Sequence, residues 1–222
     1  MILLPRLVSV LVGYCFGLFQ TSYILGRLHG IDIREHGSGN AGTTNTLRTM
    51  GKKAGAMTLL LDILKTMAAM FVVYIIFRND HPDRILLFEI YAGAGAILGH
   101  DFPFYLGFKG GKGIAATAGL VLGLHDPIII LIEAIVFFGI FFTTHYVSLG
   151  SLGLYVGLLL CVIVFGQLHI NEFKSIAQGE LIEIYVIVFL LACLAFYQHR
   201  ANIVRLMNGT ERKTYLGKHK DN

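Results

Sequence analysis

A series of long apolar runs constrains the fold of this chain more than any other feature of its sequence. A helix of about 20 apolar residues can cross the hydrocarbon core of a bilayer, and several of the runs reach that length. We therefore predict an all-α, polytopic membrane protein with about seven transmembrane helices. The runs are Leu3–Leu25, Ala54–Phe77, Ile85–Leu106, Ile114–Leu124, Ile128–Phe142, Ser148–Leu168 and Leu181–Tyr197.

The fourth and fifth runs are short, and a polar break separates them. His125, Asp126 and Pro127 lie between them, and a proline disfavours a continuous helix. An alternative for this region is one span together with a re-entrant piece.

The composition leaves little room for anything beside the membrane domain. Of the 222 residues, 55% are hydrophobic and 14% are charged, whereas soluble domains carry about 25% charged residues. We predict a single membrane domain over residues 1–222. No small-residue cleavage site follows the first run, which favours a retained helix over a signal peptide. Cysteines inside apolar runs, without metal-like spacing, predict small buried side chains and no metal site, and these are Cys15, Cys161 and Cys193.

The distribution of basic residues predicts how the chain is oriented in the membrane. With seven crossings the basic residues concentrate in alternate loops, and cytoplasmic loops carry an excess of lysine and arginine. This places the N-terminus outside and the C-terminus in the cytoplasm. It also explains the net charge of +4 without nucleic acid as a partner. The predicted cytoplasmic residues are Arg27, Arg34, Arg48, Lys52, Lys53, Lys109, Lys112, Arg200, Arg205, Arg212, Lys213, Lys218 and Lys220, and the opposite side holds Arg6, Arg78, Arg84 and Lys174.

The first predicted cytoplasmic loop has the composition of an anion-binding segment. It reads Gly-Ser-Gly-Asn-Ala-Gly-Thr-Thr-Asn-Thr-Leu-Arg over residues 37–48. Small residues let backbone N–H groups approach a phosphate, Ser38 and Asn40 add hydrogen bonds, and Arg48 suits two parallel bonds to phosphate. A flexible glycine-rich connector is the alternative. A dinucleotide-binding reading of the glycines at 37, 39 and 42 fails, because no apolar strand precedes them and the downstream Asp62 lies in an apolar run.

The second loop interleaves lysines with glycines directly before a predicted helix. It reads Phe-Lys-Gly-Gly-Lys-Gly over residues 108–113. Free N–H groups at a helix N-terminus, together with the ammonium groups of Lys109 and Lys112, favour a bound phosphate. The loop is not a nucleotide-binding P-loop, because Leu106 and Gly113 replace the first glycine and the final Ser or Thr of that motif. An ordinary basic loop is the alternative.

A third polar group follows the last apolar run. If the last helix continues beyond the run, His199, Asn202 and Arg205 share one face at intervals of three and can reach one ligand. The alternative is a basic juxtamembrane helix in contact with anionic lipid headgroups.

Some titratable residues lie within or at the ends of the apolar runs. Because an isolated charge is costly in a bilayer, we expect Asp62 and Lys65 to pair with each other, with Lys65 at the edge of the site as the alternative. We expect a structural role for His100 at the end of the third run. The sequence shows no clear partner for Glu133, Glu180 or Glu183.

The three polar segments resemble the motifs of a bacterial family, the integral membrane acyl-phosphate:glycerol-3-phosphate acyltransferases. The first loop is similar to the family's G-S-G-N-P-G-A-T-N-x-x-R, with Ala41 in place of proline and Thr43 in place of alanine. Residues 99–113 resemble the second motif, and residues 199–211 resemble H-R-x-N-I-x-R-L-x-x-G-x-E. The resemblance covers nearly the whole chain. In the family a segment like residues 146–151 also approaches the substrate, although His145 stands where an arginine is usual.

The resemblance implies an enzyme of the bacterial inner cell membrane whose active site faces the cytoplasm. It would transfer the acyl group of an acyl phosphate to the C1 hydroxyl of glycerol 3-phosphate, the first step of phospholipid synthesis. The products would be lysophosphatidic acid and phosphate, and no cofactor or metal is implied. A carrier for a phosphorylated metabolite is the rival interpretation, but carriers place their site near the bilayer midplane, often between repeats.

The resemblance also implies roles for individual residues. One group would hold the phosphoryl group of the acyl phosphate, and a second would bind glycerol 3-phosphate. His199 would act as a base or orient the hydroxyl, whose proton the substrate's own phosphate can accept. The first group is Gly110, Gly111, Lys112 and Gly113, the second is Ser38, Arg48, Lys109 and Asn202, and further substrate-binding residues are Asn40, Asn45, Ser148 and Arg205.

Overall fold

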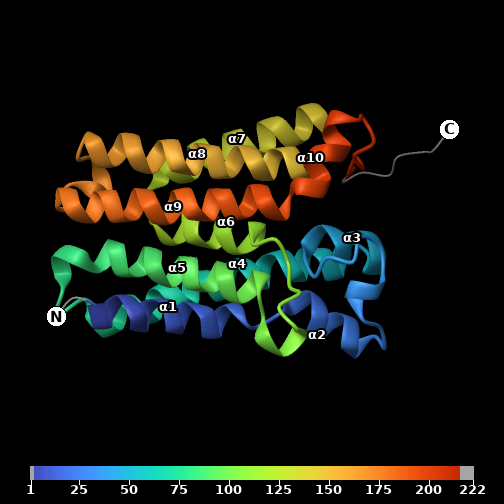
Figure 1. Ribbon diagram of the computed structural model, residues 1–222, viewed down its shortest axis with the longest axis horizontal. Helices are drawn as coiled ribbons and strands as arrows, with labels where there is room; N and C mark the ends of the chain where they lie inside the picture. Colours follow the sequence, from blue (N-terminus) through green and yellow to red (C-terminus); the bar gives the residue numbers. More distant parts are fainter. Residues whose placement is uncertain (1–2, 216–222) are drawn as a thin grey trace.

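The secondary structure is helical throughout the part of the chain that the structure describes. This computed structural model describes residues 3–215, so the predicted basic residues Lys218 and Lys220 lie outside the described residues. Most of the helices run side by side along one axis (Figure 1). The α-helices are α1 (Leu3–Gly17), α2 (Thr21–Leu28), α3 (Thr43–Met50), α4 (Lys52–Phe77), α5 (Ile85–Asp101), α6 (Ile114–Gly123), α7 (Pro127–Thr144), α8 (Val147–Gln167), α9 (Gln178–Gln198) and α10 (Arg200–Met207).

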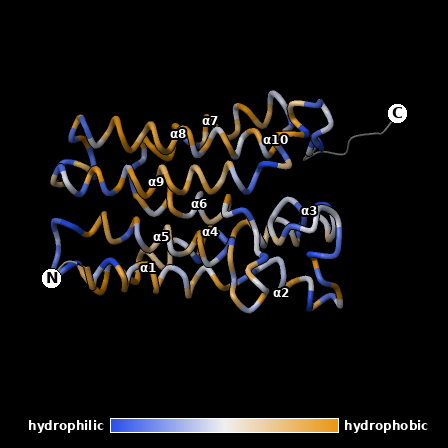
Figure 2. Tube along the Cα trace, in the orientation of Figure 1, coloured by the Kyte–Doolittle hydropathy of each residue, from blue (hydrophilic) through white to orange (hydrophobic). Residues whose placement is uncertain are grey.

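Within residues 3–215, six helical segments are long and apolar enough to cross a membrane. Hydrophilic residues gather at the two ends of the bundle and hydrophobic residues occupy the helices between them (Figure 2). The remaining predicted span is the fourth run, which forms α6. This helix has ten residues, which corresponds to a length of about 15 Å, whereas the hydrocarbon core is about 30 Å thick. The described chain starts at one end of the bundle and α10 lies at the other (Figure 1), as an odd number of passes requires. The long segments are Leu3–Leu28, Lys52–Phe77, Pro82–Leu106, Pro127–Thr144, Val147–Gln167 and Gln178–Gln198.

The polar break between the fourth and fifth runs is the N-terminal cap of α7. The Asp126 carboxylate accepts hydrogen bonds from the N–H groups of Ile128 and Ile129 at 2.9 and 3.1 Å, and Pro127 takes the first helical position, where its missing N–H costs nothing. Asn171, in the connection between α8 and α9, donates to the other Asp126 oxygen at 3.0 Å. The turn between α6 and α7 is therefore fixed by a third segment.

The first apolar run is not the single helix that its hydropathy predicts. The helix stops at Gly17 and restarts at Thr21, which leaves backbone carbonyls without helical partners inside an apolar run. Gln20 and Lys65 satisfy them: the Gln20 amide donates to the Gly17 oxygen at 3.3 Å and the Lys65 ammonium to the Phe19 oxygen at 2.7 Å. Non-helical backbone at membrane depth requires such internal partners.

Two further helices, α5 and α9, both end at the polar motifs that follow their apolar runs. The apolar run reaches Leu106, but the helix α5 ends at Asp101, beside His100 where its end was predicted and before Pro103. The residue that precedes a proline disfavours the helical conformation. The last helix does not continue through the tail: α9 ends at Gln198, and α10 starts after His199 as a separate helix.

Helices α1 and α5 pack against each other through glycine. A Cβ atom at Gly17 would lie 2.3 Å from the Ala96 carbonyl oxygen, and one at Gly95 would lie 2.3 Å from that of Val10. Both helices repeat glycine at intervals of four, at Gly13 and Gly17 and at Gly95 and Gly99. Small residues at this spacing let transmembrane backbones approach closely.

The glutamates for which the sequence offered no partner have partners in the structure. Arg6 on α1 donates to Glu183 on α9 at 2.5 Å, and Arg84 donates to Glu180 at 2.6 Å. The thiol of Cys161 contacts Glu133 at 3.7 Å. The prediction of buried cysteines is correct for Cys161 but wrong for the two others, because Cys15 and Cys193 lie on outward faces of their helices.

Candidate active site

The first polar loop is folded around the side chain of Asn45. The Asn45 oxygen accepts from the N–H of Ser38 at 2.8 Å, and its amide nitrogen donates to the carbonyls of Ile33 and His36, both at 3.0 Å. Gly37 has a φ of +63°, and a Cβ there would lie 2.3 Å from the Asn45 oxygen. Asn45 was predicted to bind substrate, but its amide is used within the loop. Through its bond to the Ser38 N–H, Asn45 fixes the position of Ser38, which is exposed at the surface.

The glycine-rich second loop is tied to the end of α5. The N–H groups of Gly110 and Gly111 donate to the carbonyls of Asp101 and His100, each at 3.1 Å. These two N–H groups are therefore not available to a phosphate. Gly113 has a φ of +71° and starts α6, whose first turn has no side-chain cap. The N–H groups of that turn are therefore the ones positioned for an anion.

The residues predicted in the tail and in α8 meet around one carboxylate, that of Glu211. It accepts hydrogen bonds from Ser148 at 2.9 Å, from Asn202 at 2.6 Å and from Arg205 at 2.6 Å. Lys112 from the second loop donates to the Asn202 oxygen. The Glu211 side chain is 7% exposed. A single glutamate thus fixes donors from α8 and α10.

The charged groups in this cluster are strongly influenced by burial and by one another. Burial, followed by the positive charge of Arg205, lowers the pKa of Lys112 to about 8. Burial opposes the ionisation of Glu211, but the hydrogen bonds that it accepts outweigh burial and hold its pKa below the ordinary value. The site is therefore a cationic cluster that contains one anchoring carboxylate.

His199 lies at the junction of α9 and α10. The ring is buried, and its Nδ1 atom lies 2.8 Å from the carbonyl oxygen of Ala195. Because that carbonyl can only accept, Nδ1 carries the proton and Nε2 presents a lone pair. Burial, followed by the charge of Lys112, lowers the pKa of His199 to about 4. At neutral pH the ring is therefore an uncharged hydrogen-bond acceptor.

Arg48 joins the first loop to the segment that carries Glu211. Its guanidinium donates to the Thr214 hydroxyl at 2.6 Å and to the Arg212 carbonyl at 3.2 Å. The N–H of Thr214 donates to the carbonyl of His145 at 2.9 Å. Residues 211–214 thus connect Arg48 to the start of α8.

The structure brings part of the predicted site together. Lys112, Ser148, Asn202 and Arg205 belong to one hydrogen-bonded cluster, and Arg48 borders it through residues 212 and 214. Ser38 and Lys109 are exposed, and Asn40 is partly buried. Glu211 and Thr214 were not predicted as site residues. The match of Glu211 to the last position of the third motif was the available signal, and Thr214 had none.

Comparison with known proteins identifies the family. The family model described as glycerol-3-phosphate acyltransferase matches residues 7–209. A glycerol-3-phosphate acyltransferase of Bacillus cytotoxicus is 43% identical over 94% of this chain and 95% of its own length. One from Staphylococcus haemolyticus is 39% identical, with 93% and 96% covered.

Solved structures agree with the sequence comparisons. The fold matches the crystal structure of PlsY (YgiH), an integral membrane glycerol 3-phosphate acyltransferase, in its glycerol 3-phosphate form. The TM-score is 0.78 at 31% identity, over 95% of this chain and 96% of that one. The lysophosphatidic acid form of the same enzyme matches with a TM-score of 0.75. The chain described here therefore belongs to the glycerol-3-phosphate acyltransferase family and is an integral membrane acyltransferase.

Proposed function

We propose that this acyltransferase uses acyl phosphate as its donor and forms 1-acylglycerol 3-phosphate and inorganic phosphate. The C1 hydroxyl oxygen of glycerol 3-phosphate attacks the acyl carbonyl carbon. The bond between that carbon and the phosphate oxygen breaks, and a phosphate oxygen takes up the hydroxyl proton. An acyl phosphate is already activated, so the protein has mainly to align two anions and stabilise the developing charge.

The observation that carries this proposal is the convergence of cationic groups from three distant segments. Lys112, Arg48 and Arg205 surround Glu211 and residues 212–214, beside the uncapped start of α6. We assign the phosphoryl group of the donor to Lys112 and the first turn of α6, with residues 110–113 shaping that pocket. We assign glycerol 3-phosphate to Ser38, Arg48, Lys109 and Asn202.

We assign His199 an orienting role. A pKa of about 4 makes the ring a weak base at neutral pH, since general bases work best with a pKa near the operating pH. Its Nε2 lone pair can still accept a hydrogen bond from the C1 hydroxyl and aim the oxygen. We expect His199→Gln, which keeps an acceptor, to retain substantial turnover, whereas an obligatory base would lose it.

Purified protein in detergent or vesicles tests the donor directly. Acyl phosphate with glycerol 3-phosphate should release inorganic phosphate and form lysophosphatidic acid in equal amounts. Acyl-coenzyme A, offered instead, should give no product. A carrier would release no phosphate above background, and product from the thioester alone would overturn the choice of donor.

We further propose that the protein lies in the bacterial inner membrane with this site facing the cytoplasm. The basic residues of both loops and those of the tail up to Lys213 gather at one end of the bundle (Figure 1). The rule that positive charges stay inside assigns that end to the cytoplasm.

A further inference from the structure

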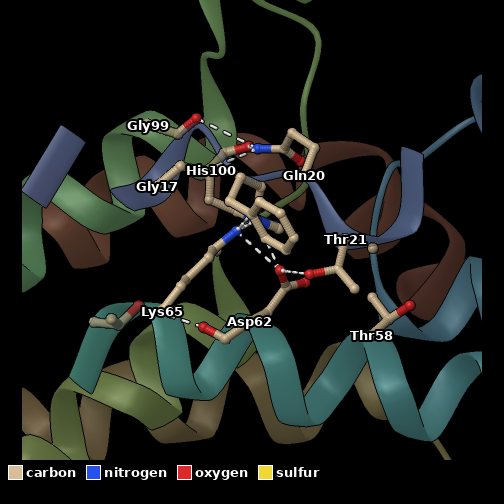
Figure 3. A network of polar contacts seen from close by, with 12 residues as sticks. Gly17, Gln20, Thr21, Thr58, Asp62, Lys65, Gly99 and His100 are labelled. Atoms are coloured by element: carbon tan, nitrogen blue, oxygen red, sulfur yellow. Dashed lines mark hydrogen bonds and ion pairs between the residues drawn. The ribbon is translucent and has the colours of Figure 1, made fainter. Parts of the chain in front are cut away.

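A buried polar cluster lies beneath the second loop, among helices that are otherwise apolar. It joins Asp62 and Lys65 on α4 to His100 at the end of α5 and to Thr21 at the start of α2 (Figure 3). The side chains of Lys65, His100 and Asp62 are 5%, 3% and 1% exposed. A buried ion pair is weak support for stability, because apolar residues of similar size often serve a core as well or better. Stability therefore does not explain why this polar cluster is buried here.

The ammonium group of Lys65 is fully used within the cluster. It contacts the Phe19 carbonyl oxygen at 2.7 Å, an Asp62 carboxylate oxygen at 2.9 Å and the His100 Nδ1 atom at 2.9 Å. Three contacts match its three N–H bonds. The hydroxyl of Thr21 donates to the same Asp62 oxygen at 2.9 Å, which fixes the carboxylate.

This arrangement sets the tautomer of His100. An ammonium group only donates, so Nδ1 must accept and the proton of the neutral ring sits on Nε2. Nε2 lies against Gly111, where a Cβ atom would be 2.0 Å away. The imidazole therefore supports the second loop directly from the membrane side.

The backbone of His100 holds the same loop. Its carbonyl oxygen accepts from the N–H of Gly111 at 3.1 Å and from the Gln20 amide at 2.8 Å. The next carbonyl, that of Asp101, accepts from Gly110. The ring and backbone of His100 thus fix Gly111, and the backbone of Asp101 fixes Gly110.

We propose that Lys65, locked by Asp62, is a positioning residue that acts through His100 to hold residues 110–113 in the conformation that binds the phosphoryl group of the donor. This inference rests on the proposed function. Of the residues assigned to glycerol 3-phosphate, Lys109 alone lies in the second loop, and the first loop is held by Asn45. Loss of Lys65 should therefore raise the KM for acyl phosphate more than the KM for glycerol 3-phosphate.

Steady-state kinetics of three variants tests the inference. Lys65→Met keeps the volume and removes the donors, and we expect it to raise the KM for acyl phosphate about 10-fold while the KM for glycerol 3-phosphate stays within about two-fold. His100→Gln reaches the Nε2 position but offers Lys65 no acceptor at the Nδ1 position, and His100→Asn offers that acceptor but does not reach Gly111. Both variants should therefore raise the KM for acyl phosphate as Lys65→Met does.

A milder change and a matched control keep the test decisive if Lys65→Met does not fold. Thr21→Val removes only the hydroxyl that fixes Asp62 and should raise the same KM by about three-fold. Thr66→Val changes a fully buried neighbour of Lys65 whose hydroxyl contacts only backbone of its own helix, and it should leave both KM values unchanged.

The outcomes separate this inference from the proposed function. Equal changes in both KM values, no change in either, or wild-type KM values in both His100 variants would refute the positioning role while the wild type still transfers acyl groups. A wild type inactive with acyl phosphate would refute the function itself.

Discussion

At the scale of single residues, Glu211 joins three side chains of the site, although it is an anion in a site proposed to bind anions. Glu211 orients these side chains, because its carboxylate accepts hydrogen bonds from Ser148, Asn202 and Arg205 at once. We predict that Glu211→Gln lowers kcat/KM about 100-fold, since hydrogen bonds to a charged group contribute about 1.5–3 kcal/mol each and the new amide would face other donors.

The control for Glu211 lies at the opposite end of the bundle. Glu180 also accepts a short hydrogen bond from an arginine, Arg84, at 2.6 Å. It lies in the first turn of α9, whereas the site lies at the last turn, where α9 leads into α10 (Figure 1). Glu180→Gln should keep kcat/KM within about two-fold, since partly exposed ion pairs contribute little. Equal losses in both variants would mean that Glu211 acts through stability alone.

Lys112 predicts a pH dependence. Its pKa of about 8 lies below the ordinary value of 10.5, so the free enzyme loses this positive charge as the pH rises through 8. We predict that kcat/KM for acyl phosphate falls above about pH 8, because a neutral amine attracts a phosphate weakly. In Lys112→Arg the guanidinium stays protonated, so the decline should move to higher pH even if the maximum is lower. An unchanged alkaline decline would assign it to another group.

At the scale of elements, the lengths of the apolar runs predicted the helices but not where they break. The end of α5 was readable from Pro103. The break after Gly17 was not readable from the sequence, because it depends on contacts with two other helices. Lys65 on α4 donates to the Phe19 carbonyl, and Gln20 donates to the His100 carbonyl on α5 as well as to that of Gly17. The same holds for the site: the sequence predicted some of its residues, and the structure was needed for others. Motif composition predicted Lys112, Asn202 and Arg205, which the structure brings into one cluster, whereas the role of Asn45 within its own loop required the three-dimensional structure.

The contact between α1 and α5 predicts which glycines the fold cannot replace. Gly95→Val would force a side chain into the Val10 carbonyl, and overpacking typically costs about 1–3 kcal/mol. Because α5 carries His100 and Asp101, we expect a lower unfolding temperature and reduced acyl transfer together. Gly139→Ala on α7 is the control, because a Cβ there meets nothing within 4 Å. It should be neutral or slightly stabilising, and a loss there would point to a partner at that face.

At the scale of the whole molecule, the site is assembled between two groups of helices. The first loop and residues 108–113 come from the part of the chain before α7, and Ser148, His199 and Glu211 come from α8 and beyond. Polar contacts join the groups at both ends, through Lys112 and Asn202 near the site and through Arg6 and Glu183 at the opposite end. Relative movement of the groups would therefore change the site directly.

Cysteine labelling tests which end of the bundle faces the cytoplasm. Single cysteines replacing exposed residues, in a background without Cys15, Cys161 and Cys193, can be labelled in intact cells with an impermeant maleimide. We expect labelling of Asp80→Cys and Lys174→Cys, which lie at the end opposite the site. Lys109→Cys and Lys213→Cys should react only after permeabilisation.

The charges explain this expectation. Inverting the bundle would carry the basic residues of both loops and the tail across the bilayer, and each lysine or arginine costs about 2.5–3.5 kcal/mol at the centre of a membrane helix. Both proposed substrates are also anions that do not cross a bilayer unaided, since burying a charge in an apolar medium is expensive. The reverse labelling pattern would place the site outside the cell. It would contradict the cytoplasmic assignment and leave the helical fold and the hydrogen bonds around Glu211 as they are.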